Sequence, residues 1–400
     1  MANSIVNTDL IAREILRIAH EKATFLGTID RQYDKSYFGR GAKHGSTLRV
    51  EMPNEYTVRS GRVMDVQDQA ETTQLITAAT QKGVDMRFNS AELALNIDQF
   101  SKTYIEPATS RLISVVESDV LQGATALVAN HTGTAGTVPG ASGNTSMIGQ
   151  ARAKLNQFLA PMGDRSLQID SVTMASVVNG DKALFHAASQ VRNANLEGYY
   201  SRAAGFDWFE NERVYRYTTG SDHTTVTTND GTIASGDEAI TMAGGNITTG
   251  TVFTFGTAAD SPVYAVHPET KTSLGFLKQF VATGNFTTSA VFAGQPYILT
   301  GAKQNVTAIP VTNKVVTPFG VASTLYRNAL AYHKDFCAFV TADLPMMADA
   351  AECTVRSQDG ISVRVWKGSD IRNDELLMRI DILYGYKVLR PEWACRINCN

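Results

Sequence analysis

The histidines and paired carboxylates are the residues best suited to acid–base or metal chemistry, and none of them stands in a catalytic pattern. His20 opens the stretch HEKAT, which lacks the second histidine of the metal-binding motif His-Glu-x-x-His. His333, in AYHKDF, is the one candidate for a buried functional histidine, but a histidine hydrogen-bonded to the backbone is the better expectation. The carboxylate pairs Asp237–Glu238 and Asp374–Glu375 stand in turn-like stretches, which is typical of solvated loop charge. We therefore expect no enzyme, and no catalytic, cofactor-binding or metal-binding residues.

The cysteines and the longest glycine-rich stretch also fit structural roles. Cys337, Cys353, Cys395 and Cys399 form no Cys-x-x-Cys pair, so we expect small buried side chains in a reducing compartment. Residues 130–146, NHTGTAGTVPGASGNTS, lack the Gly-Lys-Ser/Thr of a phosphate-binding loop and follow no predicted strand. This stretch is predicted to be a flexible surface loop.

Composition and charge narrow the class of protein. The chain has 400 residues, 43% of them hydrophobic and 19% charged, with a formal net charge of −3. This balance is typical of a globular protein of two or three domains, and it argues against a dedicated nucleic-acid binder with a basic surface. The first residues lack the basic and apolar regions of a secretion signal, and no apolar run approaches the ~20 residues that a membrane helix needs. We expect a protein made in the cytosol.

The first third of the chain changes its hydrophobic period twice. Residues 8–26 repeat apolar side chains with the period of an amphipathic helix, which must pack on another part of this chain or on another chain. In STLRVEM (46–52) and VDMRF (84–88) the hydrophobic period is two, which predicts two strands. A long charged segment connects them, so we expect an extended hairpin. Residues 107–128 then give the strongest helical pattern, with Pro107 in the first turn.

The rest of the chain is predicted to be α+β with an all-β insertion. Residues 147–205 alternate short helices (IGQARAKLNQFLA) with apolar strands (LQIDSVTMASVV). Residues 217–311 are rich in Thr and Gly, with short alternating runs between turn signals, which indicates a small β barrel or sandwich. Alternation in ISVRVW (361–366) and MRIDILYGYKV (378–388) predicts long paired strands, the second ended by Pro391. Sheet pairing should therefore hold the C-terminus.

Several stretches resemble the major capsid (coat) proteins of tailed phages, in the short-tailed-phage branch with an inserted β-barrel domain. They are RGAKHGSTLRVEMP, GYYSRAAGFDWFENERV, TGTVFTF, HPETKTSLGFLKQFVAT, ALAYHKDFCAFVTADLP and, most specifically, GISVRVWKGSDIRNDELLMRIDILYGYKVLRPEWACRI. The resemblance covers nearly the whole chain. It implies the α+β capsid fold that tailed phages share with encapsulins and herpesviruses.

The resemblance also implies a division of the chain into seven segments. These are an N-terminal arm helix (1–35), an extended-loop hairpin (36–96), a spine helix (97–130), an axial domain (131–216, returning at 313–359), an inserted β-rich domain (217–312) and peripheral-domain strands (360–400). The hairpin would lie over a neighbouring subunit. We expect its charged residues to make contacts between subunits: Arg40, Lys43, Arg49, Arg59, Arg62, Asp65, Asp68 and Glu71.

The function implied is a major capsid protein that self-assembles, as pentamers and hexamers, into the icosahedral shell around a double-stranded DNA genome. Expected partners are further copies, scaffolding and portal proteins, packaged DNA on the inner face, and a decoration protein, with no membrane and no cofactor. The protein would be made in the host bacterial cytoplasm and end in the virion. Two alternatives are an encapsulin-like nanocompartment shell and a host-attachment protein whose β module binds glycans through Tyr264, Phe276 and Phe280.

Overall fold

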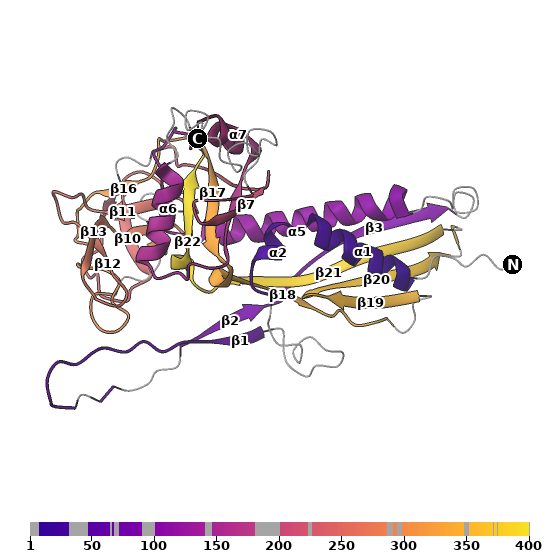
Figure 1. Ribbon diagram of the computed structural model, residues 1–400, viewed down its shortest axis with the longest axis horizontal. Helices are drawn as coiled ribbons and strands as arrows, with labels where there is room; N and C mark the ends of the chain where they lie inside the picture. Colours follow the sequence, from indigo (N-terminus) through magenta and orange to yellow (C-terminus); the bar gives the residue numbers. More distant parts are fainter. Residues whose placement is uncertain are drawn as a thin grey trace, which may run out of the picture. The chain divides into compact units, whose positions relative to one another are not determined.

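The computed structural model (Figure 1) divides the chain into two compact units. The first unit comprises Met1–Met52, Thr73–Val120 and Cys337–Leu389, and the second comprises Pro53–Thr72, Leu121–Phe336 and Arg390–Asn400. The structure describes residues 8–31, 47–64, 66–67, 72–89, 101–140, 146–180, 201–222, 226–285, 291–293, 298–347, 352–370, 372–373 and 375–399.

The first unit is built on a five-stranded sheet. Its strands are β3 (Thr80–Asn89), β18 (Cys337–Ala342), β19 (Glu352–Gln358), β20 (Ile361–Asp370) and β21 (Glu375–Val388). The long strand β21 pairs antiparallel with β20, β18 and β3. The unit also contains α1 (Thr8–Lys22), α2 (Phe25–Thr28), the two-stranded sheet of β1 (Thr47–Met52) and β2 (Thr72–Thr77), a π-helical turn (Ser101–Ile105) and most of α5 (Glu106–Ala126).

Helix α1 packs on strands β19 and β20, as Figure 1 shows. Its apolar stripe is fully covered, with Ile11, Ile15 and Ile18 at most 3% exposed. At its first turn the Thr8 hydroxyl lies 2.7 Å from the Thr354 hydroxyl, and Asp9 pairs with Arg356. The predicted amphipathic helix is therefore confirmed, and its partner is a sheet of the same chain.

The expected hairpin pairs differently from the prediction. β1 pairs with β2, whereas β3, which contains VDMRF, pairs along its whole length with β21. The alternation in β3 is as predicted, with Phe88 buried and Arg87 exposed. Its partner strand, β21, lies some 290 residues further along the chain. A local hydrophobic pattern does not indicate which distant strand will pair with it.

The second unit contains a sheet of seven strands: β4 (His131–Thr132), β5 (Arg165–Ile169), β6 (Arg202–Ala203), β7 (Phe206–Glu210), β8 (Tyr215–Thr218), β17 (Leu325–His333) and β22 (Ala394–Asn398). The helices α6 (Ser146–Gln157) and α7 (Ser171–Gly180) pack on one face of it, where Leu167, Trp208, Ala331 and Ile397 form an apolar core with Leu155. The turns Lys334–Phe336 and Pro391–Trp393 are 3₁₀-helical.

Two predictions for this unit were wrong in detail. The apolar run LQIDSVTMASVV forms a strand only in its first residues; from Ser171 it is helix α7, whose buried residues Thr173, Met174, Val177 and Val178 follow a helical spacing. The glycine-rich stretch after Asn130 begins with strand β4, which pairs with the C-terminal strand.

The C-terminal strand β22 is held by pairing on both sides, antiparallel to β17 and parallel to β4. The prediction of a C-terminus tied down by sheet pairing is thereby confirmed. Its sheet, however, is that of the second unit, because the chain crosses between units after Leu389. Pro391 ends the preceding strand as expected.

The inserted segment is all-β in its described residues. Its strands are β9 (Thr227–Thr228), β10 (Ala239–Ala243), β11 (Val252–Phe255), β12 (Tyr264–Val266), β13 (Ser273–Leu277), β14 (Gln279–Val281), β15 (Val291–Ala293) and β16 (Val316–Pro318). They surround an apolar core that includes Phe253, Phe255 and Phe280.

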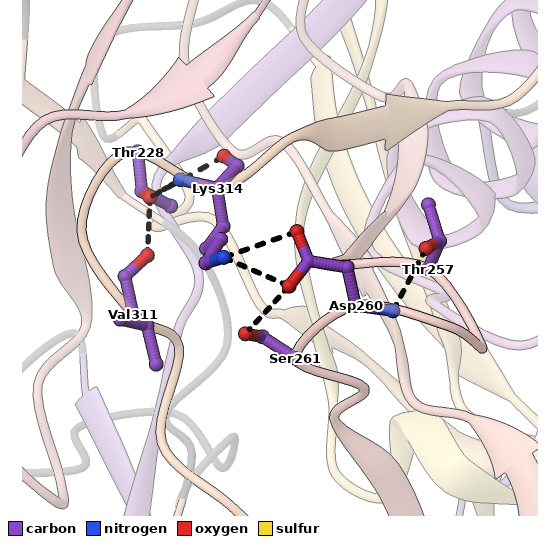
Figure 2. Close-up of polar contacts among 6 residues, drawn as sticks. All are labelled: Thr228, Thr257, Asp260, Ser261, Val311 and Lys314. Atoms are coloured by element: carbon purple, nitrogen blue, oxygen red, sulfur yellow. Dashed lines mark hydrogen bonds and ion pairs between the residues drawn. The ribbon is translucent and has the colours of Figure 1, made fainter.

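A polar cross-link joins two turns of the insert (Figure 2). The Lys314 ammonium contacts both carboxylate oxygens of Asp260, at 2.8 and 3.1 Å. The backbone N–H of Lys314 donates to the Thr228 hydroxyl (3.1 Å), which donates in turn to the Val311 carbonyl. These bonds hold the chain leading into β16 against β9 and the turn that contains Asp260.

Candidate functional site

The most exposed apolar side chains of the described residues lie in residues 53–72, which we call the arm. Val58 is 97% exposed, Val63 83%, Met64 77% and Val66 73%, and Tyr56 is 59% exposed. Large apolar side chains gathered on one exposed segment mark an interaction site, because leaving them in water is unfavourable. The arm is therefore a candidate interaction surface.

A side-chain amide joins the two limbs of the arm. The backbone N–H of Thr57 donates to Gln67 Oε1 (2.9 Å), and Gln67 Nε2 donates to the Thr57 carbonyl (2.6 Å). Gln67 thus takes the place of a strand residue in a two-hydrogen-bond pair. At the end of the arm, the Lys303 ammonium of the insert donates to the Thr72 hydroxyl (2.6 Å). In its described residues the arm has these polar ties, and its large apolar side chains from Tyr56 to Val66 are all exposed.

Three of the eight charged residues predicted to make intersubunit contacts are described, namely Arg49, Arg59 and Arg62. All three are exposed, and none has an ion pair among the described residues. Arg49 lies on β1, and Arg59 donates to the Gly61 carbonyl within the arm. The other five, Arg40, Lys43, Asp65, Asp68 and Glu71, lie outside the described residues.

His333, the one histidine considered for a functional role, is part of the packed interior. His333 is 6% exposed, accepts a hydrogen bond from the Asp335 backbone N–H at Nδ1 (3.2 Å) and packs edge-on against Trp393. Burial lowers the pKa of His333, so the ring is neutral at pH 7. Across the described ranges, no group of three or more His, Cys, Asp or Glu side chains is placed to hold a metal ion, and no helix there is long and apolar enough to cross a membrane.

Two of the three aromatic residues considered for glycan binding are packing residues. Phe280 is 1% exposed in the insert core, and Phe276 packs edge-on against Phe158, with ring centroids 6.4 Å apart. Only Tyr264 of the three lies outside these contacts.

The sequence reasoning singled out the charges of the arm and missed its apolar residues. The stretch VMDV (63–66) contains three apolar residues within a polar segment. A run this short does not indicate whether its side chains are buried or exposed. The structure supplies the missing observation, which is their exposure.

The fold and the arm can now be compared with known proteins. No curated protein matches this chain. A solved structure from Mycobacterium phage Che8 is similar over 94% of this chain and 90% of its own, with 12% identity and a TM-score of 0.50. The asymmetric unit of the bacteriophage PhiM1 mature capsid covers 88% and 82%, with 10% identity and a TM-score of 0.45. A virus-like particle from Pyrococcus furiosus covers 97% of both chains, with 8% identity and a TM-score of 0.45.

The Che8 comparison shows the fold, and a family model shows the relationship. The model for the P22 coat protein, gene protein 5, matches residues 31–396. Since this match runs through both units and the insert, the chain belongs to the P22 coat protein family.

Proposed function

We propose that this coat protein is the major subunit of a tailed-phage icosahedral shell and that its arm binds a neighbouring subunit during assembly. The family supports the first part. The observation that carries the second part is the exposure of Val58, Val63, Met64 and Val66, all within one short segment. Burial of such side chains contributes about 25 cal/mol per Å² of apolar surface removed from water.

A shell multiplies this gain because every subunit donates one arm and receives another. Subunit interfaces of stable assemblies bury on the order of 1,200 Å² or more, and they place apolar side chains at the centre and charges at the rim. The arm offers both kinds of side chain, since Arg59 and Arg62 lie between the exposed residues Val58 and Val63. The arginines would meet carboxylates of the neighbouring subunit, each exposed pair contributing about 0–1 kcal/mol.

The finer assignments rest on the family alone. Pentamers and hexamers would form the shell, a scaffolding protein and a portal protein would take part in its assembly, and a decoration protein would bind its outside. Packaged double-stranded DNA would contact the inner face without sequence preference. The net charge of −3 fits a container that does not hold DNA firmly, since phosphate contacts dominate nucleic-acid affinity. The protein would be made in the host cytoplasm and function in the virion, as a structural protein without catalysis.

The test is assembly of the full chain with a candidate scaffolding protein, followed by sedimentation and electron microscopy. We expect closed particles of regular diameter from the wild type. Val58→Asp should leave subunit folding unchanged, because the side chain is 97% exposed, yet abolish particle formation or raise the concentration needed for it at least tenfold. Val58→Ile, which keeps an apolar contact, is the matched control and should assemble.

A wild-type subunit that stays monomeric with scaffolding protein present would contradict the shell function. Normal assembly of Val58→Asp would contradict the role of the arm but leave the shell function standing.

A further inference from the structure

The seven-stranded sheet of the second unit has two very different faces. One carries the apolar core under α6 and α7. The other presents aromatic and cationic side chains from β4, β8, β17 and β22, together with the turn after β16. We call six of them the polar ring: His131, Tyr215, Tyr217, Phe319, Tyr326 and Arg396.

Each member of the polar ring contacts the next. The centroids of His131 and Phe319 are 3.9 Å apart, and those of Phe319 and Tyr326 5.9 Å. Tyr326 lies 6.1 Å from Tyr217, which stacks on Tyr215 at 5.6 Å.

Arg396 closes the ring. Its guanidinium carbon lies 5.2 Å from the centroid of Tyr215, and its backbone pairs with His131 across the parallel strands β22 and β4. Because β17 places Asn328 two residues from Tyr326 and opposite Tyr215, the Asn328 side chain belongs to the same enclosed patch.

Three side chains of this patch have polar atoms without a hydrogen-bond partner in the described part of the protein. They are Nε of Arg396, the hydroxyl of Tyr217 and the amide nitrogen of Asn328. The carbonyl end of the Asn328 amide is directed to the His131 ring, with which it makes a side-chain hydrogen bond. Arg396, Tyr217 and Asn328 are each at most 6% exposed. An isolated polar atom at such a depth costs roughly 1–3 kcal/mol, so several in one place indicate a bound species that satisfies them.

The charge of the patch identifies the species. Arg396 is fully buried; its two terminal nitrogens donate to the carbonyls of Gly250 (2.6 Å) and Ala126 (2.7 Å). These carbonyls are neutral, and no carboxylate of the described residues acts on Arg396 or His131. Lys154, which donates to the His131 carbonyl (2.6 Å), adds a second cation nearby. Burial and these two cations lower the pKa of His131 well below its ordinary value, against the opposing effect of its hydrogen bond with Asn328, so its ring is neutral at pH 7.

We propose that the polar ring encloses a binding site for a small monovalent anion of the size of chloride. Arg396 Nε, the Asn328 amide nitrogen and the Tyr217 hydroxyl would donate to it. An anion would satisfy the donors and also offset the buried charge, whereas a water molecule would do only the first.

The site connects several parts of the second unit, so anion binding should affect the stability of the folded subunit. Its members come from the C-terminal strand, the sheet and the chain leaving the insert, and Arg396 also binds the last turn of α5 and the insert residue Gly250. The site exists only when these parts are folded together. Bound anion would therefore stabilise the folded subunit in proportion to its concentration above the dissociation constant.

The test is urea unfolding of the full-length subunit in sodium chloride and in sodium gluconate at equal ionic strength. We expect the folded-to-unfolded ratio of the wild type to rise up to tenfold for each tenfold rise in chloride. Tyr217→Phe keeps the aromatic ring but removes one donor. It should raise the chloride concentration needed for the same stabilisation roughly tenfold. Tyr332→Phe is the matched control, because it removes a buried hydroxyl of the same sheet that pairs with Gln168 (3.1 Å), and it should retain the full dependence.

Bromide-soaked crystals of the same chain give the direct readout. Anomalous bromide density within the polar ring supports the site. Water density there, or equal chloride dependence in wild type and Tyr217→Phe, overturns the proposal and leaves a site for ordered water only.

Discussion

A charge network whose central pair, Arg364 and Asp381, is buried connects three strands of the first unit. Asp381 is fully buried and accepts hydrogen bonds from Arg364 Nη2 (2.6 Å) on β20 and Arg379 Nε (2.7 Å) on its own strand. Arg379 also lies 3.7 Å from Asp85 on β3. Removing one partner of such a buried pair typically costs about 3–5 kcal/mol, because the other charge is left unpaired.

The network explains why β3 has glycine at position 83. A Cβ there would lie 2.5 Å from Asp381 Oδ1 and 2.8 Å from the Ile380 carbonyl. We predict that Gly83→Ala destabilises the free subunit by about 1–3 kcal/mol in urea unfolding. Gly149→Ala is the control, because no atom lies within 4 Å of its Cβ position in α6, and it should stabilise by about 0.5–1 kcal/mol. Equal shifts in both variants would refute this explanation.

Lys278 gives a prediction for pH dependence. Burial lowers its pKa to about 8; Glu392 opposes this shift and Lys154 adds to it. The folded protein therefore releases this proton near pH 8, whereas the unfolded chain keeps it until its ordinary pKa of 10.5. Between those values the unfolded state binds more protons, so this residue makes stability rise with pH.

The measurement is the unfolding free energy of wild type and Lys278→Met from pH 7 to 10. The unfolding free energy of the wild type minus that of Lys278→Met should increase as the pH rises above 8. A difference that is constant over this range would show that Lys278 keeps an ordinary pKa.

The sequence pattern predicted which residues of the sheet share a face, but it did not predict which of the two faces is buried. Alternation placed Met378, Ile380 and Ile382 on one face, and they are buried. It placed Asp381 and Arg364 among the residues of the opposite face, and both are buried too. A period of two reports which residues share a face, but it does not report whether another element covers the second face.

Among the elements, α1 and α5 form as the periodicity predicts, within a few residues of the expected ends. The tertiary partners of the elements were not predictable in the same way. The link between α2 and α5, for example, depends on Glu117, which is fully buried and accepts hydrogen bonds from the Thr24 hydroxyl (2.7 Å) and the Phe25 N–H (3.2 Å). The sequence of α7 predicts a strand because its many β-branched residues favour strands locally, but tertiary packing overrides that preference.

The packing of α1 can be tested on its two faces. Ile15 is fully buried against the sheet, whereas Leu10 is 59% exposed on the same helix. We predict that Ile15→Ala lowers the unfolding free energy by about 2–5 kcal/mol. The control Leu10→Ala should change it by no more than about 0.5 kcal/mol. Equal effects in denaturant melts would mean that α1 does not pack on β19 and β20 in solution.

For the whole molecule, assembly should combine apolar burial with charge contacts at the arm. Arg62 is exposed and unpaired among the described residues. If it meets a carboxylate of a neighbouring subunit, Arg62→Glu should raise the critical concentration for assembly several-fold at low salt. The effect should shrink in about 1 M salt, where the screening length is ~3 Å. Arg62→Lys, which keeps the charge, should assemble normally in a light-scattering assay, and an effect independent of salt would argue against an ion pair.

The family relationship and the exposed arm lead to one central claim, that the arm binds another subunit. A reconstruction of the assembled shell by electron cryo-microscopy tests it most directly. The account predicts that Val58, Val63 and Met64 are buried against a neighbouring subunit. It would be contradicted by a closed shell in which the arm lies on its own subunit or in which these side chains remain exposed to solvent.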